Sequence, residues 1–524
     1  MPRNQVKPQS IASERAAPEL ITVLIPTRER PDTLEYSLTT CINQIDNNLR
    51  ILVSDNASQD DTRAVVERFR RRDKRVDYIN PGRRLGMSEH FEFALGHVDQ
   101  GFVTILGDDD GLFPDALATI REILRTRPDT SAISWPYSFY GYPELYVPSK
   151  NHLGIAFDKQ DEVRKSRDWL PKLTAFDVFY FELPMIYHGL VRVAVLDEIR
   201  ARAGRLILSS VPDVYLAIAI ASSIESYYRL SKSLSLAGLS QHSHGAASLF
   251  LGKDSPVVQS FLNESGLETH PLVPHLPSIP PIVLECLLRA RDAGILPKNF
   301  EINFERCVSR TFTELHTAGH PPEMLDDYLG RLAELCRRIG QTDHLERLLS
   351  FDAKARKKLE DELAATPWLP RHPILVNLKN TRVKDVAAAV IVAEAISRSE
   401  ELLQIWLEMT DEMREVRTAF DNRLSQLREL DALARSQQKE LEKRHLEFTE
   451  RIASLGQQLA ETHAESTARF HQIEKLTELL RISEKDRADR QEQIDQLTAL
   501  LAAAEQAQGG TRNRSDVAGA PRPN

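Results

Sequence analysis

The segment GFVTILGDDD, Gly101–Asp110, joins a short apolar run directly to three adjacent carboxylates. The run Phe102–Leu106 is rich in β-branched and aromatic residues and is bounded by glycines, which is typical of a buried parallel strand. Pro114 and Asp115 then precede a helical pattern over Ala116–Leu124. The carboxylates therefore fall in a strand-to-helix turn at the carboxyl end of a sheet, where open α/β sheets bind their ligands.

The chemistry of this turn follows from its charge. Clustered carboxylates raise one another's pKa unless a hard cation such as Mg²⁺ or Mn²⁺ neutralises them, often one already bound to a phosphate. Asp108, Asp109 and Asp110 thus predict a metal site beside a phosphate-bearing ligand. A solvated acidic turn without a ligand is the alternative that these residues alone leave open.

Strand and helix patterns alternate upstream of the turn in the order βαβαβαβ. This alternation predicts an α/β fold with a Rossmann-like, mostly parallel sheet flanked by helices. The expected strands are Leu20–Ile25, Arg50–Val53, Val76–Ile79 and Phe102–Leu106, and the expected helices are Leu34–Ile45, one ending near Arg72, and Met87–Val98.

Length and charge exclude several classes of protein. A chain of 524 residues is too long for one ordinary domain, and a formal charge of −9 without a strongly basic block argues against nucleic-acid binding. The most apolar windows, Val386–Ala393 and Val214–Ile220, are far too short to span a bilayer, so any membrane association is expected to be peripheral or through a partner.

The compartment is predicted to be the cytoplasm. Met1–Ala17 lacks the apolar region of a secretory signal. The cysteines have neither metal-ligand nor disulfide spacing, which suits a reducing environment; they are Cys41, Cys286, Cys307 and Cys336.

Composition divides the chain into five parts. Residues 1–18 and 509–524 are expected to be disordered, 19–250 to form the α/β domain, and 251–385 a helical domain. Residues 386–508 are almost free of glycine and proline, and an interrupted heptad repeat runs from Phe420 to Leu501. We predict a homo-oligomeric coiled coil there, with an isolated solvated helix as the weaker alternative.

Polar residues end the first two strands. Pro26, Thr27 and Arg28 end the first, and Asp55 to Ser58 end the second, so both groups share a rim with Asp108–Asp110. This ensemble resembles the family-two glycosyltransferases with the GT-A fold, over roughly Leu20–Gly245.

The resemblance implies roles for these residues. Asp55 would bind the nucleobase of a nucleotide-sugar donor, and Pro26, Thr27, Arg28, Asn56 and Ser58 would line the nucleotide pocket. Asp110 is the first choice as direct ligand of Mn²⁺ or Mg²⁺, with Asp108 or Asp109 nearer the ribose. The chain departs from the commonest family pattern at Gly107, where another acid is expected.

Two arginines precede the third helix, in the segment Asn80–Ser88. This segment resembles the family's Asn-x-Gly loop, and Arg83 or Arg84 would approach the donor diphosphate. Solvated surface arginines are the alternative.

Asp213 resembles the family's catalytic base, which deprotonates the acceptor hydroxyl. A helix N-cap is the alternative role, although Pro212 precedes it. His242 and His244 are candidate metal ligands or merely exposed, and His188 is a weaker candidate for the acceptor cleft. The aromatic segment from Trp135 to Tyr146 either stacks on sugars or belongs to the core.

The implied activity is metal-dependent, inverting transfer of a sugar, with UDP as the expected nucleotide, to a hydroxyl acceptor. Bacterial surface glycans, lipid-linked glycans or proteins are the expected acceptors, and a complex at the inner face of the cell membrane is a possible partner. A sugar nucleotidyltransferase fits less well, because Pro26–Pro31 contains no glycine. The other alternative is a non-catalytic coiled-coil scaffold with a degenerate transferase domain.

Overall fold

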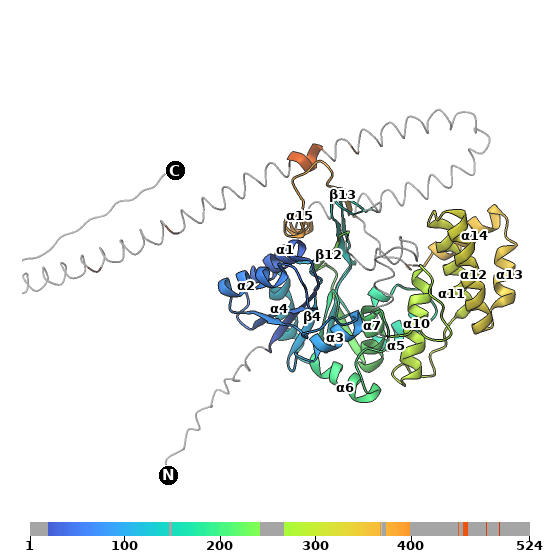
Figure 1. Ribbon diagram of the computed structural model, residues 1–524, viewed down its shortest axis with the longest axis horizontal. Coiled ribbons are helices and arrows are strands. Elements are labelled where there is room, and N and C mark those ends of the chain that lie inside the picture. The colour runs from blue at the N-terminus through green and yellow to red at the C-terminus, as the bar shows by residue number, and fades with distance from the viewer. Residues whose placement is uncertain are drawn as a thin grey trace, which may run out of the picture. The chain divides into compact units, whose positions relative to one another are not determined.

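The computed structural model describes residues 19–145, 149–241, 267–366, 368 and 374–398, together with the short pieces 449, 454–458, 478 and 492 (Figure 1). The chain divides into two compact units, Met1–Ala453 and Ser454–Asn524. The predicted disordered ends, nearly all of the heptad repeat, and both His242 and His244 lie outside the described residues.

An eight-stranded sheet forms the centre of the first unit. Its order is β3-β2-β1-β4-β10-β6-β11-β9, and β1 to β4 run parallel to their neighbours within that group. The α/β fold with a mostly parallel sheet is therefore confirmed. The strands are β1 (Ile21–Thr27), β2 (Leu49–Asp55), β3 (Val76–Ile79), β4 (Phe102–Ile105), β6 (Ala132–Ser134), β9 (Glu162–Lys165), β10 (Gly189–Arg192) and β11 (Ser226–Arg229).

Helices cover both faces of this sheet because successive side chains of a strand point to opposite sides. Val23 and Ile25 of β1 join one core cluster, which also contains residues of α1, α2 and α4. Leu24, between them, joins a second cluster with residues of α3, α6 and α7. The helices are α1 (Pro31–Ile42), α2 (Thr62–Arg72), α3 (Met87–Leu95), α4 (Ala116–Thr126), α5 (Ser166–Thr174), α6 (Val193–Ala203) and α7 (Pro212–Ser223).

A second, five-stranded sheet follows the carboxylate turn, and the sequence pattern did not predict it. Its order is β13-β8-β7-β12-β5, with Ser235 of β12 opposite Leu112 of β5. This pairing brings β12 over the turn, although the two strands are far apart in sequence. The strands are β5 (Gly111–Leu112), β7 (Ser138–Gly141), β8 (His152–Ile155), β12 (Ser235–Leu239) and β13 (Ile374–Asn377).

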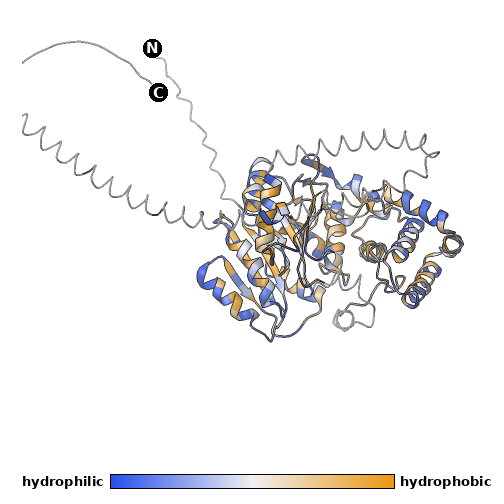
Figure 2. Ribbon diagram, turned by 90° about the horizontal axis from the view of Figure 1, so that it is seen from above, coloured by the Kyte–Doolittle hydropathy of each residue, from blue (hydrophilic) through white to orange (hydrophobic). Residues whose placement is uncertain are grey.

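The predicted helical region is present, but its core is continuous with that of the α/β domain. Buried residues of α7, α10 and α11 belong to one cluster, and α10 packs directly on α7. In Figure 2 the helices of this region, at the right of the view, carry hydrophobic residues on one side and hydrophilic residues on the other. The helices are α10 (Ile279–Asp292), α11 (Phe304–Thr317), α12 (Pro322–Ile339), α13 (Thr342–Leu349) and α14 (Ala353–Ala364).

The last long described helix, α15 (Val386–Arg398), differs from the expectation. The composition of residues 386–508 assigns this helix to the coiled coil, but Val386, Ala389, Val390 and Ala393 are buried in the cluster that contains α1. The helix packs on α1, β5, β8 and β12 (Figure 1). Its apolar stripe, three and four residues apart, thus faces the α/β domain, so residues 386–398 belong to that domain and not to a coiled-coil seam.

None of the helices within the described ranges is long and apolar enough to cross a membrane.

Candidate active site

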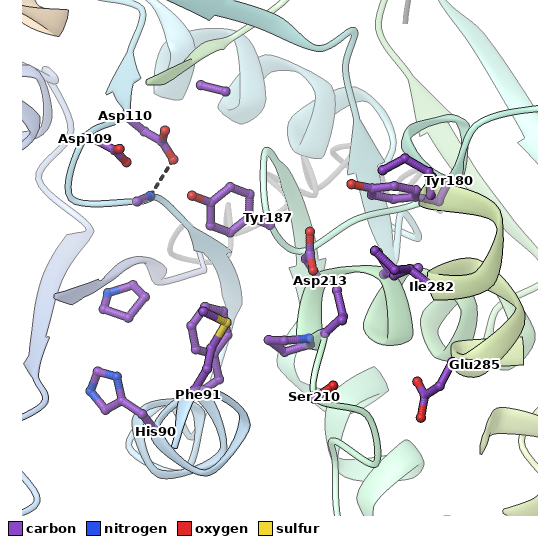
Figure 3. A pocket seen from close by; sticks show the side chains of 18 of the residues that line it. His90, Phe91, Asp109, Asp110, Tyr180, Tyr187, Ser210, Asp213, Ile282 and Glu285 are labelled. Atoms are coloured by element: carbon purple, nitrogen blue, oxygen red, sulfur yellow. Dashed lines mark hydrogen bonds between the residues drawn. The ribbon is translucent and has the colours of Figure 1, made fainter. Parts of the chain in front are cut away.

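A cavity of about 420 Å³ opens at the carboxyl ends of β1 and β4. Pro26, Thr27, Arg28 and Asn56 line one part of it, together with the carboxylate turn. Asp213 lines another part, and Figure 3 shows Tyr187 between Asp213 and the pair Asp109 and Asp110. Of the predicted site residues that the structure describes, those not on the cavity wall are Asp55, Ser58, Arg83, Arg84 and His188.

Asp55 is fully buried and precedes Asn56, which lines the cavity. Its Oδ2 accepts from the Tyr78 hydroxyl at 2.6 Å and from Asn80 Nδ2 at 3.3 Å, and its Oδ1 accepts from the Ser58 backbone N–H at 3.0 Å. Burial, together with the hydrogen bond to Asp55, raises the pKa of Tyr78 to about 12. This carboxylate therefore holds the ends of β2 and β3 together.

Two loops at this rim are fixed by side-chain hydrogen bonds. The Asn56 amide pairs with both backbone groups of Leu85, each at 2.8 Å. Ser58 Oγ accepts from the backbone N–H of Glu29 at 2.8 Å, and Glu29 has a positive φ of 54°. Asn56 and Ser58 thus shape the rim, and Asn56 also lines the cavity.

The two candidate arginines of the Asn80–Ser88 loop point to carboxylates. Arg83 is exposed and forms an ion pair with Glu89 at 2.6 Å, whereas Arg84 lies 4.0 Å from Glu29. Arg28 and Arg30 are the arginines on the cavity wall within the described residues.

Asp108 has its own counter-charge. Its Oδ1 accepts from Arg30 NH1 at 2.9 Å, and its Oδ2 accepts from the Thr27 hydroxyl at 2.7 Å. Burial alone would lower the pKa of Arg30, but Asp108 and Asp109 raise it above its ordinary value. Sequence reasoning missed Arg30, although it stands in the same turn as Thr27 and Arg28.

Asp110 is held by the backbone of two segments. Its Oδ2 accepts from the Gly107 N–H at 2.6 Å and its Oδ1 from the Gly238 N–H at 2.7 Å. Hydrogen bonds and the proximity of His188 outweigh burial and lower the pKa of Asp110. The lowered pKa favours the ionised form, and the two backbone hydrogen bonds fix the direction of the carboxylate (Figure 3).

The glycine at position 107 has a steric explanation. A Cβ there would lie 2.5 Å from Tyr187 Oη and 2.6 Å from Asp110 Oδ2. No side chain fits unless this hydroxyl and carboxylate move. The departure from the family pattern at Gly107 thus has a local cause: the turn bends so that the Asp110 carboxylate lies against residue 107.

Asp109 is buried beside Asp110 in the middle of the turn. Its Oδ2 accepts from the Ser240 hydroxyl at 2.7 Å. Burial, then the nearby charge of Asp110, raises the pKa of Asp109 to about 7, although Arg30 and Ser240 act in the opposite direction. A cation at this place would relieve the excess negative charge.

These residues fit a divalent cation that is shared with a ligand. Among the described residues, no group of three or more His, Cys, Asp or Glu side chains is arranged to hold a metal alone. Mg²⁺-type ions are commonly held by one or two carboxylates plus substrate phosphates, however, and Asp109 and Asp110 supply the hard oxygen atoms for that arrangement.

Asp213 lies in the first turn of α7, with Pro212 in the preceding helical position. The N-cap residue is Val211, so the N-cap alternative for Asp213 is wrong. The Asp213 carboxylate accepts from the backbone N–H groups of Asp213 and Val214, yet burial raises its pKa above the ordinary value. It faces the cavity on the side of Tyr180 and Tyr187 (Figure 3).

His188 supports the carboxylate turn and is not part of the cavity wall. Its Nε2 lies 3.3 Å from Asp110 Oδ2, and its Nδ1 lies 2.8 Å from Ser235 Oγ. Ser235 Oγ also accepts from Trp135 Nε1 at 2.8 Å, so its own hydrogen can go to His188 Nδ1. That arrangement would place the imidazole hydrogen on Nε2, toward Asp110.

Most of the described aromatic residues between Trp135 and Tyr142 belong to the core. Trp135, Tyr140 and Tyr142 are buried, whereas Tyr137 lines the cavity and stacks on Phe181, with ring centroids 4.3 Å apart. The core alternative therefore describes most of this segment, and Tyr137 is the exception.

The helical region contributes a cavity wall that sequence reasoning missed. Leu276, Ile279, Ile282 and Glu285 line the cavity beside Asp213. No local motif marks these residues, because their place depends on the packing of α10 against α7.

Part of the α/β domain is similar in sequence to known proteins. Residues 22–185 match the family model described as "Glycosyl transferase family 2". A curated relative, the GalNAc(5)-diNAcBac-PP-undecaprenol beta-1,3-glucosyltransferase of Campylobacter jejuni, is 35% identical over 103 residues. That alignment covers 20% of this chain and 33% of the relative, so the chain spans about a third of the relative's length.

Two solved structures resemble the chain loosely. S. aureus TarS 1-349 in complex with UDP is 15% identical, with a TM-score of 0.38, over 73% of this chain and 92% of that one. A mannosyltransferase from Pyrobaculum calidifontis, in complex with GDP-Man and Mn²⁺, is 14% identical, with a TM-score of 0.30, over 74% of this chain and 90% of that one. At these scores neither structure identifies a ligand of this chain. The family match therefore assigns residues 22–185, about a third of the chain, to a family-two glycosyltransferase domain.

Proposed function

We propose that the chain is a metal-dependent, inverting glycosyltransferase. It transfers a sugar from a nucleoside-diphosphate sugar, with UDP as our choice of nucleotide, to a hydroxyl group of a bacterial surface glycan. The observation that carries this proposal is the shared cavity, because the end of β1, the carboxylate turn and Asp213 all line it. The relative's printed name describes a glucosyltransferase that acts on a diphosphate-linked lipid, which supports the substrate class.

The nucleotide end of the cavity has the groups that a donor requires. Pro26, Thr27, Arg28 and Asn56 would surround the nucleoside, and the Arg28 guanidinium group offers positive charge to the diphosphate. Asp109 and Asp110 would hold a divalent cation, which when bound neutralises charge on the departing diphosphate. Because Asp108 is already paired with Arg30, we assign it to positioning and not to the metal.

At the other end, Asp213 has the properties of a general base. Its raised pKa makes it a better proton acceptor than an ordinary aspartate, provided that the pH keeps it ionised. It would take the proton of the acceptor hydroxyl as that oxygen attacks the anomeric carbon. Attack from the side opposite the diphosphate inverts the configuration at that carbon.

The test of this role is Asp213→Asn. We expect the variant to lose sugar transfer, by about 10² to 10⁴-fold, and to keep nucleotide binding, because an amide cannot accept the proton. The measurement is transfer of radiolabelled sugar from UDP-sugars to lipid-linked and soluble glycan acceptors. Transfer at the wild-type rate would exclude Asp213 as the base.

We further propose a peripheral location at the inner face of the cell membrane, with homo-oligomers formed through the heptad repeat. The free, buried thiols Cys41, Cys286, Cys307 and Cys336 suit a reducing compartment. A glycan attached to a lipid would be presented to a cytoplasmic enzyme at that surface. A non-catalytic scaffold is the rival, and it predicts no nucleotide binding at the carboxylate turn.

A further inference from the structure

A buried carboxylate of the helical region reaches the segment that leads to Asp213. Glu285 belongs to α10, is 5% exposed and lines the cavity. In Figure 3 its carboxylate lies near the segment that carries Ser210, below Asp213. The α10 helix packs directly on α7, the helix that begins with Pro212 and Asp213.

Ser209 connects Glu285 to this segment. The Ser209 hydroxyl donates to Glu285 Oε2 at 2.5 Å and accepts from the Val211 backbone N–H at 3.2 Å. The Ser209 carbonyl accepts from the Ser88 hydroxyl of α3 at 2.6 Å. Because Val211 is the N-cap residue of α7, this network fixes the chain two residues before Asp213.

The other carboxylate oxygen of Glu285 is occupied as well. Oε1 accepts from Arg289 Nε at 3.0 Å and from the His270 backbone N–H at 3.2 Å. Arg289 compensates the negative charge of Glu285 next to the cavity. With both oxygens occupied and the charge paired, Glu285 is suited to holding the backbone and not to accepting a proton from a substrate.

We propose that Glu285 is a positioning residue that holds the Ser209–Val211 segment, and through it Asp213, in place for catalysis. The helical region then has a defined task, because it anchors the loop that carries the base. This inference rests on the proposed function for the role of Asp213, but the contacts of Glu285 and Ser209 do not depend on that role. An error of about 1 Å in a catalytic group can cost roughly 100-fold in rate.

Amide hydrogen exchange tests the positioning without any substrate. In Glu285→Ala and in Ser209→Ala, we expect exchange in peptides covering residues 206–216 to rise by about tenfold, because the same link is removed. Glu285→Gln keeps an oxygen acceptor for Ser209 and should restore most of the protection. The matched control is Ser309→Ala. Ser309 is a buried serine of α11 that does not line the cavity, and its Oγ lies 2.8 Å from His344 Nε2.

Kinetics then separates positioning from a general loss of structure. The probes are UDP-glucose and UDP-N-acetylglucosamine, and the readout is the UDP released when water takes the place of the acceptor hydroxyl and receives the sugar. We expect Glu285→Ala to lower kcat by about 10 to 100-fold at an unchanged donor KM, with rescue by Glu285→Gln. Ser309→Ala should behave like the wild type in both values.

The inference would be overturned if residues 206–216 of Glu285→Ala exchanged their amide hydrogens at the wild-type rate. It would also be overturned if the exchange rate rose equally in peptides throughout the first unit. An unchanged kcat in Glu285→Ala would also overturn it if Asp213→Asn were inactive. If Asp213→Asn instead released UDP at the wild-type rate, the proposed function would fail. The local exchange result would still show whether Glu285 holds the segment.

Discussion

Arg30 lies 2.9 Å from Asp108, so one carboxylate of the acidic turn is neutralised by the protein itself. The two side chains are 15% and 4% exposed, which makes this a largely desolvated ion pair. The partners of the remaining carboxylates, Asp109 and Asp110, include the Ser240 and Tyr187 hydroxyls, two backbone N–H groups and the His188 imidazole. The turn thus contains one carboxylate that is paired with an arginine and two that have other kinds of partner.

The ion pair gives the first prediction. Removing one partner of a buried pair leaves an uncompensated charge, so Arg30→Met should lower the free energy of unfolding by about 3 kcal/mol. Adding Asp108→Asn to Arg30→Met should restore part of the lost free energy of unfolding, because the unpaired Asp108 charge is then absent. Urea unfolding of both single variants and the double variant measures the coupling. Additive effects would show that the pair contributes no coupling to stability.

The second prediction concerns Gly107. An alanine Cβ would clash with Tyr187 Oη at 2.5 Å and Asp110 Oδ2 at 2.6 Å, so Gly107→Ala should cost roughly 1 to 3 kcal/mol and weaken donor binding. Tyr187→Phe removes one of the two obstacles. We expect the double variant Gly107→Ala/Tyr187→Phe to be more stable than Gly107→Ala alone in thermal unfolding. A Gly107→Ala protein with wild-type stability and nucleotide binding would refute the steric account.

His90 gives a pH dependence of stability. Burial, with a smaller effect of Arg28, lowers the pKa of His90 to about 4, and its Nε2 lies 2.9 Å from Ser54 Oγ. Between pH 6.5 and 4 the unfolded chain binds a proton at this histidine that the folded chain does not, so stability falls as the pH falls through this range, by up to about 3 kcal/mol. His90→Gln should flatten that part of the profile.

The control for this prediction is the exposed His97 of the same region, changed to glutamine. The measurement is the unfolding midpoint of the wild type, His90→Gln and His97→Gln from pH 7.5 to 4. Parallel profiles for the wild type and His90→Gln would mean that other groups cause the acid sensitivity.

The fourth prediction separates α15 from the heptad repeat. Val386 and Val390 pack against Gly111, where a Cβ would meet their methyl groups at 3.0 and 2.7 Å. A chain that ends after Arg398 should keep its melting temperature, whereas one that ends after Lys379 should lose about 3 kcal/mol or more with the four buried residues of α15. Light scattering of the full chain should give at least a dimer, and the chain ending at Arg398 should be monomeric.

Local pattern predicted the first half of the α/β domain well. The β3 strand has the expected bounds, and β4 ends one residue earlier than expected, because short β-branched runs between polar turns leave few alternatives. The prediction that the polar residues after these strands lie together followed from the strand assignment, since neighbouring parallel strands end at the same edge of a sheet. Thr27 and Asp55 are indeed register partners.

Contacts between segments far apart in the chain determine the features that the sequence pattern did not predict. The β5 strand has only two residues, Gly111 and Leu112, and exists because β12 pairs with it. Glu285 reaches the cavity through the packing of α10 on α7. The stripe of α15 has the spacing of a coiled-coil seam, and only tertiary contacts show that it faces the α/β domain.

The central claim is a cation-dependent donor site at Asp109 and Asp110, and ligand-induced thermal stabilisation tests it most directly. The panel is UDP, GDP, CDP and their common sugar conjugates, with and without Mn²⁺, on the wild type and on Asp110→Asn. A ligand that binds only the folded state raises its melting temperature. We predict a rise with UDP or a UDP-sugar that requires Mn²⁺ and is lost in Asp110→Asn. No shift with any nucleotide, in the presence or absence of Mn²⁺, would contradict the donor site and favour the scaffold.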